Sequence, residues 1–128
     1  MNQVKFNGTI TSGQGNGKKY LELPWVKRQI QEKLGYTAYP GTLNVKLLEK
    51  NTTQRKKLTG KKAIQICPAE GYCFGAIFKA TINGLECAVV IPQIEGYPEN
   101  ILEVIAPLYL RGALKLKDKD QVAVTVFV

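Results

Sequence analysis

The feature that most constrains the fold is a series of short segments in which apolar and polar residues alternate. Val4, Phe6 and Ile10 share one face of an extended chain, and polar residues occupy the other face. A period of two over this length predicts a strand with one buried face. Further strands are predicted at 20–23, 42–48, 63–67, 74–82, 85–91 and 121–128, whereas the apolar segment 99–106 is ambiguous.

Turn and helix signals complete this pattern. Asn83-Gly84 separates two of the predicted strands and is a strong hairpin signal. Pro24 opens a predicted helix that ends at Gly35 and carries an apolar stripe at four-residue spacing. One or two further helical turns are predicted within 107–114. The sequence therefore predicts a mainly β fold, a compact β-barrel with one main α-helix and a short second helix.

Length and composition fit a single domain over residues 1–128. The 128 residues are 45% hydrophobic and 22% charged, the balance of an ordinary globular protein, which excludes a disordered chain. No apolar run approaches the ~18 residues of a membrane span, and the polar segment Met1–Asn7 does not resemble a signal peptide. We therefore expect a cytoplasmic monomer without membrane contacts.

Two residue counts exclude several kinds of chemistry. The sequence contains no histidine, so His-based acid–base catalysis, Ser-His-Asp and Cys-His nucleophiles and His-ligated zinc are excluded. Cys67, Cys73 and Cys87 are an odd number without C-x-x-C spacing, which excludes a disulfide framework and a four-cysteine metal site. We expect these cysteines to be reduced and buried.

Positive charge is concentrated in one stretch of the chain. The formal net charge is +8, and between Lys46 and Lys62 seven basic residues stand against Glu49 alone. Such a stretch attracts polyanions, including nucleic acids, anionic lipids and nucleotide phosphates. Charge alone is explained more simply by a solvated loop that keeps the protein soluble.

The first motif with chemical content is the glycine-rich segment Gly13-Gln14-Gly15-Asn16-Gly17-Lys18. Its spacing fits neither the dinucleotide-binding fingerprint nor the P-loop. Its backbone can still approach an anion closely, with N–H groups directed at phosphate oxygens. The alternative interpretation is a hairpin tip without a ligand.

The second motif is Tyr39-Pro40-Gly41-Thr42-Leu43-Asn44, a tight turn directly before a predicted strand. Thr42 and Asn44 fall on one face of that strand, opposite Leu43. A hydroxyl and an amide oxygen are hard ligands of the kind that Mg²⁺ accepts beside phosphate oxygens and waters. Alternatively, the two residues are the polar outer face of a surface strand.

The third motif is Glu103-Val104-Ile105-Ala106-Pro107, followed by Arg111. It contains one carboxylate inside an apolar segment. Such a carboxylate either faces solvent at a strand edge or lines a site, and the residues alone favour solvent.

In this order and spacing, the three motifs resemble the archaeal-type CTP-dependent riboflavin kinase family over essentially the whole chain. The resemblance implies a six-stranded cradle-loop (RIFT-type) barrel. It also implies transfer of the γ-phosphoryl group of CTP to the 5′-hydroxyl of riboflavin, giving FMN and CDP, with one Mg²⁺ ion per active site. Phosphoryl transfer depends on positioning and electrostatic stabilisation, so a chain without histidine can perform it.

The resemblance further implies roles for individual residues. Thr42 and Asn44 would hold Mg²⁺, and Glu103 would contact the ribityl end of the flavin as the candidate catalytic residue. Glu95 stands where the family usually has a flavin-side hydroxyl residue. The nucleotide would be bound by two segments: Gly13, Gln14, Gly15, Asn16, Gly17 and Lys18, and Leu108, Tyr109, Leu110 and Arg111.

Two alternative functions remain open at this point. Cradle-loop barrels also include DNA-binding regulators, and the basic stretch is a fair electrostatic footprint for nucleic acid. Nucleic acid is nevertheless the less favoured partner, because the stretch has no aromatic residue that could stack on bases. The other alternative is a relative that binds nucleotide or flavin without catalysis.

Overall fold

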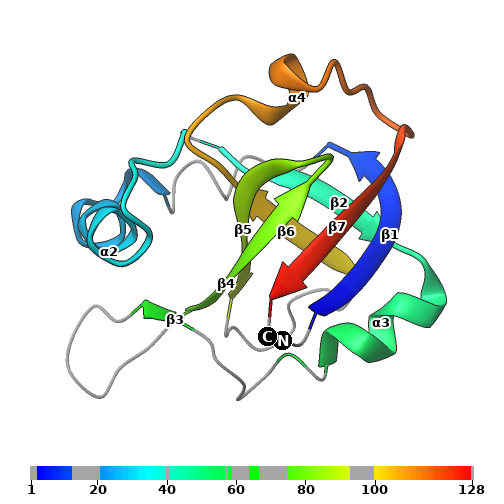
Figure 1. Ribbon diagram of the computed structural model, residues 1–128, viewed down its shortest axis with the longest axis horizontal. Coiled ribbons are helices and arrows are strands. Elements are labelled where there is room, and N and C mark those ends of the chain that lie inside the picture. Colours follow the sequence, from blue (N-terminus) through cyan, green and yellow to red (C-terminus); the bar gives the residue numbers. More distant parts are fainter. Residues whose placement is uncertain are drawn as a thin grey trace.

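The computed structural model describes residues 3–12, 21–39, 41–56, 58, 64–66, 75–92 and 100–127. Its centre is a closed antiparallel barrel of six strands in the order β4-β5-β6-β2-β1-β7, with β7 pairing back onto β4 (Figure 1). The predicted six-stranded barrel is therefore confirmed. Its strands are β1 (Gln3–Thr11), β2 (Leu43–Leu47), β4 (Gly75–Ile82), β5 (Leu85–Pro92), β6 (Ile101–Ile105) and β7 (Gln121–Phe127). The short strand β3 (Ile64–Ile66) pairs with β4 outside this ring.

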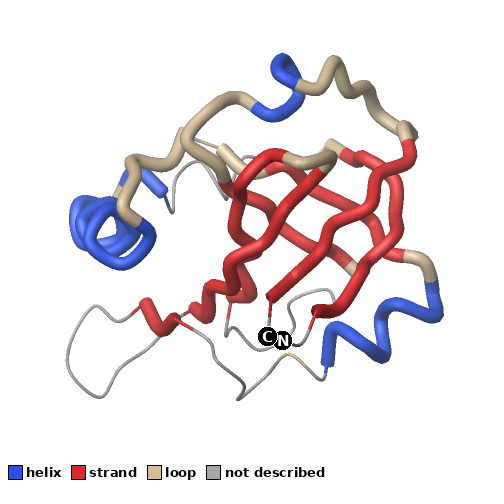
Figure 2. The backbone as a smooth tube through the Cα atoms, in the orientation of Figure 1, coloured by secondary structure: helices blue, strands red, loops and turns tan. Residues whose placement is uncertain are grey.

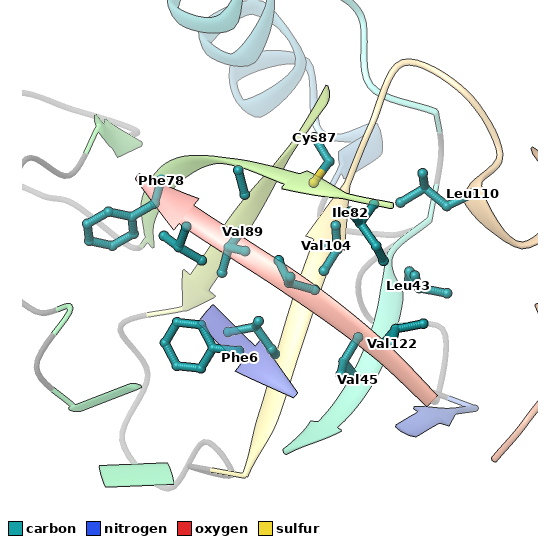
Figure 3. Packing of buried hydrophobic residues seen from close by; sticks show 14 of the residues in the cluster. Phe6, Leu43, Val45, Phe78, Ile82, Cys87, Val89, Val104, Leu110 and Val122 are labelled. Carbon is teal, nitrogen blue, oxygen red and sulfur yellow. The ribbon is translucent and has the colours of Figure 1, made fainter. Parts of the chain in front are cut away.

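The alternation in the sequence decides which side chains fill the barrel. Phe6 of β1 is buried in one cluster with Val45 of β2, Val104 of β6 and Val122 of β7 (Figure 3), and Ile10 and Leu102 belong to the same cluster. Successive residues of a strand point to opposite faces, so the polar residues between them lie on the outer face. The ambiguous segment 99–106 contains a strand for the same reason, because alternate residues of β6 enter the barrel.

The hairpin between β4 and β5 forms where the sequence predicts it. Asn83 and Gly84 adopt φ values of 48° and 81°, and Ile82 pairs with Leu85 on either side of them. Two successive residues with positive φ are typical of the type I′ turn, whose twist matches that of the flanking strands.

One helix packs on the outside of the barrel. α2 (Pro24–Leu34) has the predicted bounds and ends at Gly35, whose φ is 82°. Its buried residues Val26 and Ile30 belong to a second hydrophobic cluster together with outward-facing residues of β4, β5 and β6. Figure 2 shows this helix beside the strands. α2 therefore covers one side of the barrel wall.

The strand predicted at 20–23 is wrong. Leu21 and Glu22 are helical, and the Leu21 side chain is buried in the cluster beneath α2. A pattern of four residues is too short to distinguish a strand from a helical turn, and here packing against the barrel decides the conformation. The short second helix predicted within 107–114 is present as α4 (Leu110–Ala113).

The basic stretch is not only a loop, because it contains the helix α3 (Glu49–Lys56). Tertiary contacts hold this helix: Asn51 Oδ1 accepts a hydrogen bond from the Asn7 backbone N–H at 2.9 Å, and Leu58, just after the helix, is buried in the barrel cluster. α3 has no apolar stripe, so the sequence carried no periodic signal for it. α3 is thus a helix that the sequence does not predict.

Gly8 lies where β1 leaves no room for a side chain beside β2. A Cβ atom at this position would lie 2.7 Å from Val45 Cγ1 and would also collide with the Lys46 carbonyl oxygen. We expect Gly8→Ala to lower the free energy of unfolding by about 1–3 kcal/mol, the usual cost of overpacking. Urea denaturation would measure it, with Thr9→Ala on the outer face as the matched control. An equal effect of both substitutions would contradict this explanation.

Candidate active site

Three polar side chains form a row across the outer face of β1, β2 and β6. Asn44 pairs with Thr11 of β1 on one side and with Glu103 of β6 on the other. Directly paired residues of antiparallel strands point to the same face, with Cβ atoms ~4.5–5.5 Å apart. Their neighbours Leu43 and Val104 are buried inside the barrel. The row is therefore presented outward.

Thr42 and Glu103 are joined by a hydrogen bond. The Thr42 hydroxyl donates to Glu103 Oε1 at 3.0 Å, and both residues are half-buried. A hydroxyl that donates its proton retains acceptor lone pairs for a further partner. Glu103 is thus half-buried on the outer face of β6, with one carboxylate oxygen engaged by Thr42.

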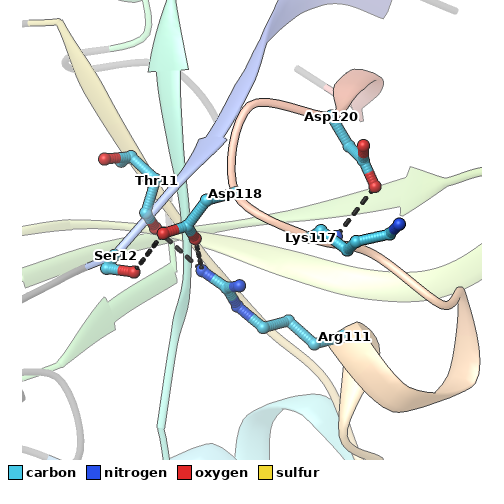
Figure 4. A network of polar contacts seen from close by, with 6 residues as sticks. All are labelled: Thr11, Ser12, Arg111, Lys117, Asp118 and Asp120. Atoms are coloured by element: carbon cyan, nitrogen blue, oxygen red, sulfur yellow. Dashed lines mark hydrogen bonds and ion pairs between the residues drawn. The ribbon is translucent and has the colours of Figure 1, made fainter.

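Arg111 links the segment after β6 to the end of β1. Its Nη2 atom donates to the Thr11 carbonyl oxygen at 3.2 Å and forms an ion pair of 2.7 Å with Asp118 Oδ1 (Figure 4). The Ser12 hydroxyl donates to the other oxygen of the same carboxylate at 2.7 Å. Ser12 directly precedes the glycine-rich segment. Asp118 therefore ties Arg111, in the segment after β6, to Ser12 at the end of β1.

These contacts change the acidity of Asp118. The hydrogen bond from Ser12, followed by that from Arg111, lowers the pKa of the Asp118 carboxyl below its usual value. Both donors favour the ionised form. The carboxylate therefore stays ionised to a lower pH than an unpaired aspartate would.

A pocket of about 210 Å³ opens between the turn before β2 and the segment after β6. The Tyr39 backbone N–H donates to the Ala106 carbonyl at 2.7 Å and holds the two segments together. The rings of Tyr39 and Tyr109 stack with their centroids 5.1 Å apart. The pocket is lined by Tyr39, Gly41, Thr42, Leu43, Val104, Ala106, Leu108, Tyr109, Leu110 and Arg111.

The structure thus brings together Thr42, Asn44, Glu103 and the segment Leu108–Arg111. Gly13–Lys18 and Glu95 lie outside the described residues. The alternation of β1 predicts Thr11 on the outer face, but no motif marked it as a site residue. Sequence reasoning also missed the contact of Asp118 with Ser12, because the two residues are 106 positions apart in the chain.

The described part of the basic stretch, residues 46–56 and 58, lies away from the pocket. β2 begins beside the pocket at Leu43 and ends at Leu47, so α3 starts at the opposite end of the barrel (Figure 1). Arg55 of this stretch is buried, with an exposed fraction of 8%, rather than displayed to solvent. None of the described residues between Lys46 and Leu58 lines the pocket.

Cys87 is a buried free thiol, as the sequence predicts, while Cys67 and Cys73 lie outside the described residues. Burial, with a smaller effect of the neighbouring Glu86, raises the pKa of Cys87 to about 12. A thiol that stays protonated is a poor nucleophile. Within the described ranges, no three His, Cys, Asp or Glu side chains gather as a metal-binding group.

The chain matches a known protein family over most of its length. A family model for CTP-dependent riboflavin kinases, described as domain of unknown function DUF120, matches residues 10–126. The chain belongs to the CTP-dependent riboflavin kinase family. No helix in the described part of this family member is long and apolar enough to cross a membrane.

Several relatives of the chain carry the name riboflavin kinase. The proteins from Archaeoglobus fulgidus and Ignicoccus hospitalis are 42% and 41% identical to the chain over 98% and 97% of its length. The protein from Pyrobaculum aerophilum is 41% identical over 98%. The chain spans 55%, 72% and 61% of the length of these three relatives, respectively.

The link through Asp118 leads to a prediction about its titration. We expect Ser12→Ala to raise the pKa of Asp118 towards its ordinary value, because the largest stabilising contact of the carboxylate is lost. The folded-state pKa is depressed, so the stability it contributes is present above the unfolded pKa and is lost as pH falls through the folded pKa. NMR titration of the carboxyl carbon measures the shift, with Thr9→Ala as control. An unchanged titration in Ser12→Ala would contradict the role of Ser12.

Proposed function

We propose that this chain transfers the γ-phosphoryl group of CTP to the 5′-hydroxyl of riboflavin, giving FMN and CDP in a Mg²⁺-dependent reaction. Family membership supports riboflavin and a nucleotide as substrates, and the family's name supports CTP as the donor. The observation that carries the proposal is the hydrogen bond between Thr42 and Glu103, at the pocket and beside Asn44. We further propose a cytoplasmic monomer without nucleic-acid partners.

The side-chain oxygens of Thr42 and Asn44 are ligands of the kind that Mg²⁺ binds. Mg²⁺ takes hard oxygen ligands and is usually bound through one or two protein groups together with phosphate oxygens and waters. Thr42 and Asn44 would hold the ion, since the Thr42 hydroxyl donates to Glu103 and keeps its lone pairs for another partner. When bound, the ion supplies charge neutralisation at the phosphates.

Glu103 is suited to orient the substrate hydroxyl. A carboxylate has about four acceptor sites on its two oxygens, so it can accept from Thr42 and from the 5′-hydroxyl of riboflavin together. In a loose phosphoryl-transfer transition state, charge lies mainly on the transferred group and catalysis is largely positioning. Glu103 therefore acts chiefly by holding the attacking oxygen in line, and removal of its proton is a secondary role.

The nucleotide is proposed to lie between Gly13–Lys18 and Leu108–Arg111, and Glu95 is proposed to contact the flavin. Arg111 is already engaged by Asp118 and by the Thr11 carbonyl. These contacts hold the Arg111 guanidinium at the end of β1, where we propose that it contributes positive charge near the phosphates.

Incubation of the purified chain with riboflavin, Mg²⁺ and each of CTP, ATP, GTP and UTP tests the proposal. We expect FMN to form with CTP in clear preference to ATP, and to stop when EDTA removes the metal. Chromatographic separation of riboflavin from FMN gives the readout. If the chain binds CTP or riboflavin but forms no FMN with any nucleotide, it is a binding protein and the proposed transfer is wrong.

The role of Glu103 gives a second prediction. Glu103→Gln keeps an acceptor oxygen but loses basicity, whereas Glu103→Ala loses both. If Glu103 orients the hydroxyl, the Gln variant retains most of kcat and the Ala variant loses far more. General-base catalysis, which contributes ~10²–10⁴-fold, would make both variants equally slow and abolish the acidic limb of the pH–rate profile. Unchanged rates in both variants would remove Glu103 from the site.

A further inference from the structure

We infer that Tyr39 and Tyr109 form an aromatic platform on which the base of the nucleotide stacks. The family resemblance assigns no role to Tyr39. The inference rests on the proposed function and adds the position of the base to it. It begins from an unusual feature of the surface, a stacked pair of tyrosines open to solvent.

Large apolar side chains gather on the surface at the pocket. Five such residues are exposed among those described, and Tyr39, Leu108 and Tyr109 all line the pocket. The two tyrosines are 42% and 51% exposed although their rings are stacked, with an interplanar angle of 29°. A contiguous apolar patch of this kind is typical of a ligand-binding groove. A planar aromatic ligand would extend the stack and remove the exposed ring surface from water.

The backbone positions both rings. The N–H of Tyr39 is bonded to the Ala106 carbonyl, which anchors the turn to the segment after β6. The ring of Tyr109 lies against Gly112: a Cβ atom added at Gly112 would come within 3.0 Å of Tyr109 Cδ2. The absence of a side chain at Gly112 therefore lets the Tyr109 ring lie over α4. A ring platform fixed in advance loses little conformational entropy when a ligand binds.

Size and neighbouring groups favour the base over the flavin ring. The pocket, at about 210 Å³, is smaller than the ~300–1,000 Å³ that encloses a drug-sized ligand, so a single pyrimidine ring fits better than the three fused rings of riboflavin. Arg111 and Thr42, the groups proposed near the phosphates, line the same pocket. Glu103, the group proposed for the flavin, is not among its lining residues.

Stacking is expected to contribute to nucleotide affinity rather than to the choice between bases. Every nucleobase has a π-face, so stacking on an aromatic side chain raises affinity with little discrimination between bases. Tyr39 therefore contributes to nucleotide affinity, and the choice of cytosine must come from hydrogen bonds to the edge of the base. A triphosphate without a base cannot stack on the two rings, so the platform does not change its affinity.

Binding measurements on Tyr39→Leu and Tyr39→Phe test the platform. Isothermal titration in the presence of Mg²⁺ gives the affinities for CTP and for inorganic tripolyphosphate, and fluorescence quenching gives the affinity for riboflavin. We expect Tyr39→Leu to weaken CTP binding at least about fivefold, the lower end of measured base-stacking contributions. Tripolyphosphate and riboflavin should bind as to the wild type, and Tyr39→Phe should retain CTP affinity.

Leu48→Ala is the matched control, because Leu48 is equally exposed at 45% but follows β2 at the opposite end of the barrel. Unchanged CTP affinity in Tyr39→Leu would overturn the platform while leaving the proposed function intact. Weakened riboflavin binding with unchanged CTP binding would assign the stacked ring to the flavin and also overturn it. A wild-type chain that binds no CTP would instead contradict the proposed function itself.

Discussion

The pairing of β4 with β7 is the interaction on which the rest of the structure depends. Ala80 pairs with Val126 and Ile82 with Val124, and this pairing turns an open sheet into a closed barrel. Closure removes the free edges that β4 and β7 would otherwise expose. It also gives every strand an inside and an outside, so that alternate residues either fill the core or face outward.

The outer wall of the barrel is divided between stability and the candidate site. α2 covers the wall at β4, β5 and β6, where Ile77 and Val90 are apolar. Farther along the sheet, at β6, β2 and β1, the outward residues are Glu103, Asn44 and Thr11. The same backbone pairing that builds the core therefore aligns the polar groups, and the strands hold them in place.

Loops at one end of the barrel complete the site. The turn before β2 and the segment after β6 are joined by a backbone hydrogen bond, and Asp118 connects Arg111 with Ser12. The phosphoryl transfer proposed for this site requires neither a histidine nor a reactive thiol. Phosphoryl transfer is a reaction for which positioning and electrostatics are sufficient.

The strands, the main helix and the Asn83-Gly84 hairpin could be predicted from the sequence because their signals are local: alternation, an apolar stripe and a turn dipeptide. The resemblance of the motifs to the riboflavin kinase family pointed to Thr42, Asn44 and Glu103 as candidate site residues, which the pairing of β2 with β6 brings together. Only the tertiary structure decided that α3 is helical, since contacts with β1 hold a helix that has no apolar stripe. It alone also brought Asp118 to Ser12 and Tyr39 to Tyr109, because these partners are distant in the chain and meet only through the pairing of β1 with β7 and of β2 with β6.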